Sequence, residues 1–472
     1  MTDKKVMEKK NLVWRYIALA ISCLLLCGVI AVAVYFKLTG DSQNVQGVNP
    51  TESIATETGT DTGSETVTET GTETETESET VTETETGTET ETETETETET
   101  ETEVEIEPEQ KKISLMMIGD NLLHLGIVWT GKQADGSWNF DFLFAPIQEY
   151  INKADIAMIN QETIFGGNNL GFTGYPRFNS PTEVGDAIAK AGFDVVLHSS
   201  NHSGDKGIAG INHCVDFWKT HPEVLMQGIY KETDEAGQNI GLLEIDGTVF
   251  AFLNYAYGPN ASTIPAEIRG HMGILCNWDR SNGNLNFTQL NPDVLTDIKR
   301  AEELADVVVV CPHWGTEYTF NPSGYQKKFA QQMVEAGADL IIGTHPHVVQ
   351  PVEWIETENG NKALCYYSLG NYVSTQKDPK TMLEAMAWVT FVVDENGVQI
   401  AQEDTGVIPM VCQYKDGPVR FQNIYFLDQY TQELADKHGI RTYGGVDFQV
   451  SDLNKWSSEV FGDWVLDSQG IK

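Results

Sequence analysis

The feature that most limits how this chain can fold is a run in which Thr and Glu alternate without interruption over residues 88–103. The wider segment 51–110 carries 22 acidic side chains and no Lys or Arg. Such an alternation has no apolar face, and repulsion between the Glu side chains favours an extended, solvated chain. We therefore expect residues 37–110 to form a disordered acidic linker. An alternative role for this tract is a polyanion that binds divalent cations or the cell wall.

An uncharged, mostly apolar run precedes the linker at residues 16–36, and a helix of this length is about long enough to cross a bilayer. Five Lys and Arg side chains lie before this run. By the positive-inside rule, residues 1–15 are expected in the cytoplasm and everything after the span outside the cell. The alternative is a secretory signal that is cleaved near Ala31-Val32-Ala33. The apolar run continues to residue 36, which favours an uncleaved, single-pass anchor in the cell membrane.

Residues 111–472 have the mixed composition of a globular domain, with 45 acidic and 24 basic side chains. This balance does not indicate a protein that binds nucleic acid. Strand-like and helix-like segments alternate from residue 113 onward, which predicts an α/β domain outside the cell. The Cys residues of this domain, which form no close pair, are Cys214, Cys276, Cys311, Cys365 and Cys412. Cys311 and Cys365 lie inside apolar strand-like runs, where we expect buried free thiols.

The predicted elements fall into two groups of strands with helices between them. Buried strands are expected at residues 113–118, 156–159, 195–197, 307–311 and 340–343, and helices at 142–152, 183–191, 210–219, 293–305 and 325–336. A second group of strands is expected at residues 240–245, 249–254, 363–368, 386–393 and 398–401. Two facing sheets with helices on their outer sides accommodate both groups.

Polar side chains that can bind a metal follow several of these strands. Asp120 and Glu162 end two apolar strands, and His313 ends a third. Ligands of open α/β sheets bind at strand ends, and a buried carboxylate is normally paired or coordinates a metal. Asn201-His202 follows another strand, and it offers a neutral oxygen ligand beside a proton donor.

His345-Pro346-His347 is the strongest metal-binding signal in the chain. In an extended segment, side chains two residues apart project to the same side, about 7 Å from each other. Two imidazoles at that spacing suit a pair of metal ions, which lie about 3.5 to 4 Å apart in two-metal sites. We therefore expect this tripeptide to be extended and to contribute two ligands.

Seven short motifs occur in an order and at spacings that resemble the CapA capsule-synthesis family. This family is associated with poly-gamma-glutamate capsules and is similar to the calcineurin-like metallophosphoesterases. The resemblance covers residues 113–375. The motifs are Gly119-Asp120, Asn160-Gln161-Glu162, Ser200-Asn201-His202 with Asp205 and Gly207, His313-Trp314-Gly315 with Glu317-Tyr318, Gly337-Ala338-Asp339, His345-Pro346-His347, and Tyr367-Ser368-Leu369-Gly370-Asn371.

The resemblance implies a metallophosphoesterase-like four-layer αββα sandwich that holds one or two divalent ions, which Mn, Fe or Zn would suit. It implies that Glu162 bridges two ions and that His202 is the general acid. The remaining ligands it implies are Asp120 and His347 for one ion, and Asn201, His313 and His345 for the other.

The chain departs from the family pattern at the first of these two sites. The bridging carboxylate is Glu162 where phosphoesterases generally have Asp, and Leu122 stands where a His is usual. His124 is a candidate replacement for that ligand. Asp205, Glu317 and Asn371 are further candidates for ligands or pocket residues.

The resemblance also implies a role at the surface of a Gram-positive bacterium, in the synthesis of poly-gamma-glutamate, a capsule or another cell-envelope polymer. The protein would be a metal-dependent hydrolase or transferase, with the polymer or other capsule-synthesis membrane proteins as partners. The alternative is a non-catalytic component of capsule assembly or attachment whose metal is structural. The acidic domain attracts a polyanion only at its cations, so phosphoesters and glycans stay open as substrates.

Overall fold

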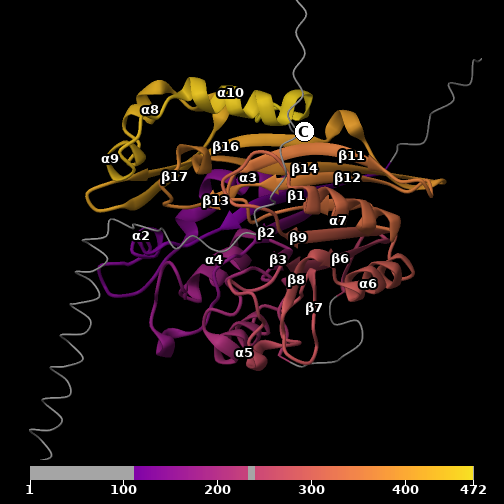
Figure 1. Cartoon of the computed structure of the whole chain (residues 1–472). Helices are drawn as coiled ribbons and strands as arrows, with labels where there is room; N and C mark the ends of the chain where they lie inside the picture. Colours follow the sequence, from indigo (N-terminus) through magenta and orange to yellow (C-terminus); the bar gives the residue numbers. More distant parts are fainter. Residues whose placement is uncertain (1–110, 232–239, 471–472) are drawn as a thin grey trace, which may run out of the picture. The chain divides into compact units, whose positions relative to one another are not determined.

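The computed structural model describes residues 111–231 and 240–470 (Figure 1). Both ranges belong to one compact unit. The predicted cytoplasmic tail, membrane span and linker all lie outside the described residues. Among the helices of the described part, none is long and apolar enough to cross a bilayer.

The larger sheet has nine strands, seven of them in the order β17-β16-β14-β1-β2-β3-β4. Strands β1 to β4 run parallel, and β14 runs antiparallel beside β1. The strand bounds are β1 Lys111–Asn121, β2 Ile156–Asn160, β3 Val195–Leu197, β4 Leu225–Gln227, β13 Asn371–Val373, β14 Leu383–Asp394, β15 Gly397–Ile400, β16 Gly406–Lys415 and β17 Arg420–Phe426.

The smaller sheet has the order β11-β12-β10-β9-β6-β5, and its four central strands run parallel. The strand bounds are β5 Gly241–Ile245, β6 Thr248–Ala256, β9 Val307–His313, β10 Leu340–Ile342, β11 Val349–Glu356 and β12 Lys362–Leu369. A separate hairpin consists of β7 Cys276–Trp278 and β8 Leu285–Leu290.

Along the sequence, the helices connect these strands or follow the last of them. Three of them begin with side-chain caps, since Asn291 caps α6, Ser323 forms a capping box at α7 and Thr431 caps α8. The helix bounds are α2 Leu125–Val128, α3 Gln148–Lys153, α4 Glu183–Ala191, α5 Gly207–Trp218, α6 Pro292–Glu302, α7 Gly324–Glu335, α8 Gln432–Asp436, α9 Ile440–Tyr443 and α10 Val450–Phe461.

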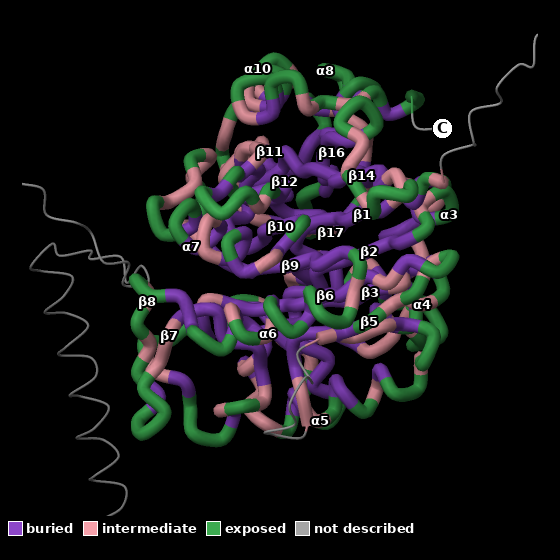
Figure 2. The backbone as a smooth tube through the Cα atoms, turned by 90° about the vertical axis from the view of Figure 1, so that its right-hand side faces the viewer, coloured by how far each residue is buried: buried purple, intermediate pink, exposed green. Residues whose placement is uncertain are grey.

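The period of two along the strands explains the layers. In β1, Met116 and Ile118 face the core that contains side chains of α3, α4 and α5, whereas Leu115 and Met117 face the smaller sheet. The smaller sheet turns its other face, with Val308 of β9, toward α6 and α7. Figure 2 shows both sheets buried in the middle of the domain. The predicted α/β class is confirmed, in the layer order helix, sheet, sheet, helix.

The predicted elements are present except that the helix expected at 142–152 is two 3-10 turns, Asp141–Leu143 and Ala145–Ile147, followed by the short α3. The two predicted groups of strands do not correspond to the two sheets. Strands β14 and β15 belong with β1, whereas β5, β6 and β12 belong with β9 and β10. Apolar runs indicate that a strand is buried, but they do not specify its neighbour. Elements that the sequence did not indicate are β4, β7, β8, β11, β13, β16, β17, α2 and α8 to α10. All five Cys of the domain are buried and free, which was expected for Cys311 and Cys365.

Glu384 of β14 is a buried acid without an evident role. Its side chain is fully buried, and neither carboxyl oxygen has a hydrogen-bond partner in the described part of the chain. Burial raises the pKa of Glu384 well above its usual value of 4.5. The folded protein therefore keeps this group protonated at pH values where the unfolded chain ionises it. Its contribution to stability is complete below about pH 4.5 and is lost as the pH rises.

We predict that Glu384→Gln flattens the pH dependence of stability. The difference in free energy of unfolding between variant and native protein should shift in favour of the variant by up to about 1.4 kcal/mol per pH unit above pH 4.5. Urea unfolding at several pH values between about 5 and 8 measures this slope. Glu395→Gln, at an exposed acid in the turn after β14, is the control. Parallel stability curves for Glu384→Gln and native protein would contradict the prediction.

Candidate metal centre

The carboxyl ends of parallel strands from both sheets meet at one place. Asp120 lies near the end of β1, Glu162 lies two residues after β2, and His313 ends β9. Gly119 allows the close approach at this point, because a Cβ atom there would lie 2.1 Å from the carbonyl oxygen of Gly370. That same oxygen accepts a hydrogen bond of 3.0 Å from the backbone N–H of Asp120. The site therefore lies where ligands of open α/β sheets bind.

Glu162 lies at the centre of the cluster. It is 1% exposed, and neither carboxylate oxygen has a hydrogen-bond partner among the described residues. Its Oε1 lies 3.8 Å from Nε2 of His313, 3.9 Å from Nε2 of His347 and 3.9 Å from Nε2 of His202. Burial raises the pKa of Glu162 well above its usual range. A buried carboxylate that is surrounded by imidazoles but hydrogen-bonded to none of them fits a cation site.

Asp120 and His347 are adjacent to Glu162. Oδ1 of Asp120 accepts a hydrogen bond of 2.7 Å from Nδ2 of Asn160, and Oδ2 lies 3.2 Å from Nδ1 of His347. Burial disfavours a charge on His347, but the carboxylates of Glu162 and Asp120 outweigh it and raise the pKa of His347 to about 10. A cation that binds to this imidazole must therefore displace a proton.

Asn201 and His313 form the other side of the cluster. Nε2 of His313 lies 3.0 Å from Oδ1 of Asn201, and Nδ1 lies 3.0 Å from Oγ1 of Thr344. If both donor atoms bound one ion at about 2.1 Å, a separation of 3.0 Å would give an angle of about 90° at the ion. Burial lowers the pKa of His313 and of His345 well below the usual range, so both rings are neutral, which is the form that binds metals.

The prediction of an extended His345-Pro346-His347 segment is wrong. His345 has φ 98° and His347 has φ 58°, and both values lie in the left-handed region that non-glycine residues rarely adopt. The imidazole centroids are 5.8 Å apart. Backbone strain of this kind persists only where the surroundings fix the conformation, and it clusters at functional sites.

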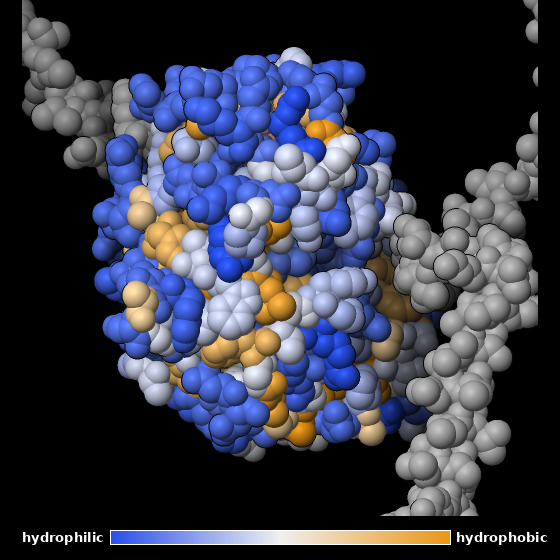
Figure 3. Space-filling view, turned by 90° about the vertical axis from the view of Figure 1, so that its left-hand side faces the viewer, coloured by the Kyte–Doolittle hydropathy of each residue, from blue (hydrophilic) through white to orange (hydrophobic). Residues whose placement is uncertain are grey.

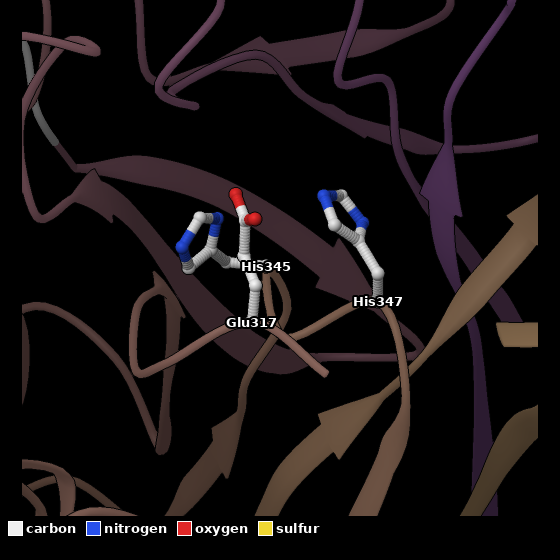
Figure 4. A group of neighbouring side chains, drawn as sticks. All are labelled: Glu317, His345 and His347. Carbon is white, nitrogen blue, oxygen red and sulfur yellow. The ribbon is translucent and has the colours of Figure 1, made fainter. Parts of the chain in front are cut away.

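Two groups of side chains in the described part are arranged to hold a metal ion, and they share His347. One group is Asp120, Glu162 and His347, and the other is Glu317, His345 and His347. Within each group the candidate ligand atoms all lie within 4.8 Å of one another. Figure 4 shows the Glu317 carboxylate near the two imidazoles of the second group. Nδ1 of His345 is buried without a hydrogen-bond partner in the part of the chain described.

His202 and Asp205 form a pair beside these groups. Nδ1 of His202 lies 2.8 Å from Oδ2 of Asp205, and the same oxygen accepts a hydrogen bond of 2.6 Å from the backbone N–H of Phe178. The Phe178 ring meets the His202 ring edge-on, with centroids 4.7 Å apart. Asp205, one of the candidate ligands, therefore orients His202 in this structure.

His124 and Asn371 belong to neither of the two groups of candidate ligands. Nδ1 of His124 accepts a hydrogen bond of 3.4 Å from the backbone N–H of Thr375, and burial lowers the pKa of His124 to about 4. The structure does not bring His124 into either group. Asn371 directs Oδ1 toward Nδ1 of His347 at 3.1 Å, so it contacts a candidate ligand.

The surface next to His124 is partly apolar. Leu125 and Trp129, at the two ends of α2, are 38% and 45% exposed. The loop around Gly174 lies against Leu125. Figure 3 shows the side of the molecule on which α2 lies, where apolar patches interrupt a mostly hydrophilic surface.

Three polar residues have roles at the site that were not predicted. Asn160 orients Asp120, Thr344 orients His313, and Asn260 contacts both Asn201 and His202. Asn160 belongs to a predicted motif and Thr344 directly precedes another, so their place in the sequence was a usable signal. Asn260 lies in a loop after β6, where an Asn after Gly and Pro usually indicates only a turn.

We predict that metal affinity rises with pH, because a cation must displace the proton of His347. Between about pH 6 and pH 9 the apparent association constant for Mn²⁺ should rise about tenfold per pH unit for each proton released. Competition with a chelator measures the constant. His221→Ala is the control, because in the described part of the chain this imidazole contacts Asp186 and Glu223 and not the candidate ligands. Its association constant should rise with pH as steeply as that of the native protein. An affinity that is independent of pH would contradict this protonation state.

Comparison with known proteins assigns the chain to a family. The model of the family "Bacterial capsule synthesis protein PGA_cap" matches residues 114–376. The chain is 26% identical over 314 residues to the capsule biosynthesis protein CapA of Bacillus anthracis, which covers 65% of this chain and 69% of that protein. It is 30% identical over 207 residues to the PGA biosynthesis protein CapA of Bacillus subtilis, which covers 43% of this chain and 48% of that protein.

Two solved structures are similar to parts of the chain, at low sequence identity. A putative 5'-nucleotidase from Staphylococcus aureus has a TM-score of 0.39 and 15% identity, and the match covers 63% of this chain and 54% of that one. The NAD nucleotidase NadN of Haemophilus influenzae has a TM-score of 0.38 and 11% identity, with coverage of 74% and 68%. The resemblance inferred from the motifs is confirmed by the family match, and the chain belongs to the PGA_cap family of bacterial capsule synthesis proteins.

Proposed function

We propose that this protein is a metal-dependent hydrolase or transferase that acts on a phosphoester or a related linkage during the synthesis of a capsular or other cell-envelope polymer. The observation that carries the proposal is the His202–Asp205 pair beside the unpartnered carboxylate of Glu162. A metal with a purely structural role needs ligands, but it does not need a proton donor held at its edge.

The donor set fits divalent cations that accept both nitrogen and oxygen ligands, such as Mn, Fe or Zn. We infer that Glu162 would contribute to holding both ions, one of them together with Asp120 and His347. Asn201, His313 and His345 would hold the other ion, and Glu317 is placed to add a ligand. When bound, such an ion lowers the pKa of a coordinated water and so makes a nucleophile available at neutral pH.

The remaining chemistry belongs to His202. A carboxylate can only accept a hydrogen bond, so Nδ1 of His202 carries the proton that is shared with Asp205. Nε2 is then the atom that exchanges a proton with substrate, and it lies on the side of the ring that faces Glu162. The edge-on ring of Phe178 limits rotation of the imidazole. With a proton on both nitrogens, His202 can therefore protonate the leaving oxygen from Nε2, and Asp205 stabilises the positive charge that the ring carries before this transfer.

We predict that His202→Ala retains bound metal and fold but loses at least about 100-fold in turnover, since a general acid contributes that much or more to the rate. His345→Ala should lose metal as well as turnover. A panel of phosphomonoesters, phosphodiesters and envelope polymers, assayed beside metal analysis, provides both readouts. His221→Ala is the matched control away from the cluster.

Two results would contradict this account. Wild-type turnover in His202→Ala would reject His202 as the general acid, because then this imidazole does not transfer the proton. A native protein that binds metal but turns over none of the panel would reject the enzymatic proposal and favour the non-catalytic role in capsule assembly or attachment.

We further propose that residues 16–36 anchor the protein in the cell membrane, with residues 1–15 in the cytoplasm and the catalytic domain outside. The apolar run and the basic residues before it support this placement. Envelope polymers and other capsule-synthesis membrane proteins are the partners that such a position makes accessible.

This placement predicts that protease added to intact cells removes the domain that begins near residue 111. The fragment that stays with the membrane should then retain the amino terminus. Detection of tags at both ends by blotting distinguishes the outcomes, and a cytoplasmic marker protein reports whether the cells stayed intact. Full protection of the carboxyl-terminal tag would contradict the proposed orientation.

A further inference from the structure

Asn260 connects a candidate metal ligand with the proton donor. It lies in the loop that follows β6, and its residue is exposed at the surface. Its side chain reaches Asn201 on one side and His202 on the other. The backbone N–H of Asn260 also donates to the carbonyl of Asn201 at 3.3 Å. The loop and the segment after β3 are thus held together at two points.

The carbonyl group of the Asn260 side chain fixes the orientation of the Asn201 amide. Oδ1 of Asn260 accepts hydrogen bonds from Nδ2 of Asn201 at 2.9 Å and from the Tyr257 hydroxyl at 3.1 Å. Since the Asn201 nitrogen is engaged in this way, its Oδ1 faces Nε2 of His313. A rotated amide would present two N–H donors to the cation instead of an oxygen. The contact with Asn260 therefore selects the orientation that can bind metal.

The amide nitrogen of Asn260 marks the position of the leaving group. Nδ2 of Asn260 lies 3.4 Å from Nε2 of His202. Nδ1 of the same imidazole is occupied by Asp205, so Nε2 must give its proton to the substrate. An oxygen that takes this proton has to lie within about 3 Å of Nε2, beside the Asn260 amide. When Nε2 carries that proton, the amide N–H and the Nε2–H are both donors and cannot bond each other, so both can donate to this oxygen.

We propose that Asn260 is both a positioning residue for Asn201 and a contact for the oxygen that His202 protonates. The first part concerns metal binding alone. The second part rests on the proposed function. The amide oxygen of Asn260 serves the first role and the amide nitrogen serves the second. A substitution that removes only the nitrogen, compared with one that removes the whole amide, therefore distinguishes the two roles.

The test compares Asn260→Ala, Asn260→Asp and a control in the full-length protein. Asp keeps an oxygen that accepts from Asn201 and Tyr257, but its carboxylate cannot donate to a leaving oxygen. Ala removes both functions. Asn284→Ala is the control, because this exposed amide bonds Thr263 near the same loop without an observed bond to Asn201 or His202 among the described residues. Mn²⁺ affinity is measured by chelator competition, and kcat with p-nitrophenyl phosphate and its diester.

Asn260→Ala should bind Mn²⁺ about 10- to 100-fold more weakly, as expected for loss of a group that orients a ligand. Asn260→Asp should keep the native affinity but lose about tenfold in kcat, the effect of one missing hydrogen bond. Asn284→Ala should match the native protein in both measurements.

Each part of the proposal has a result that overturns it. Native Mn²⁺ affinity in Asn260→Ala overturns the positioning role, whether or not the protein is an enzyme. Native kcat in Asn260→Asp overturns the contact with the leaving oxygen. If native protein and Asn284→Ala hydrolyse neither ester, the second part fails together with the proposed function, while the affinity comparison still decides the first.

Discussion

The buried carboxylate of Glu162 is the constraint on which the site depends. Removing a carboxylate from water costs several kcal/mol unless other charges or hydrogen bonds compensate. Here three imidazole nitrogens approach to within 3.9 Å, yet no hydrogen bond satisfies either oxygen in the described part of the chain. A cation between these groups would recover that cost. Folding and metal binding are therefore expected to be linked in this domain.

The two sheets are both needed to build this environment. β1 and β2 supply Asp120 and the segment that carries Glu162, whereas β9 and β10 lead into His313 and His345. A direct bond joins the two sides, since the backbone N–H of His345 donates to Oδ2 of Asp120 at 3.2 Å. The positive φ values of His345 and His347 show that this arrangement fixes the backbone as well as the side chains. Small shifts between the sheets would thus change the spacing of the ligands.

Much of the fold and of the site could be predicted from sequence, for identifiable reasons. The β1 and β9 runs are apolar enough to be buried on both faces, and both end in a residue that can bind metal. Sheet membership could not be predicted, because β14 is as apolar as the strands of either sheet. The bent backbone at His345-Pro346-His347 depends on contacts made across the two sheets, and so does the role of Asn260. Residues 1–110 carry strong sequence signals for a membrane span and an acidic linker, but they lie outside the residues that the structure describes.

The proposal that Glu162 is a metal ligand can be tested by anomalous diffraction from crystals of the protein grown with Mn²⁺. Data collected on both sides of the Mn absorption edge should give one or two strong anomalous peaks about 2.0 to 2.2 Å from the Glu162 carboxylate, with the imidazole nitrogens of His313 or His347 at similar distances. A map without an anomalous peak near Glu162, at a Mn²⁺ concentration that saturates binding in solution, would contradict the claim.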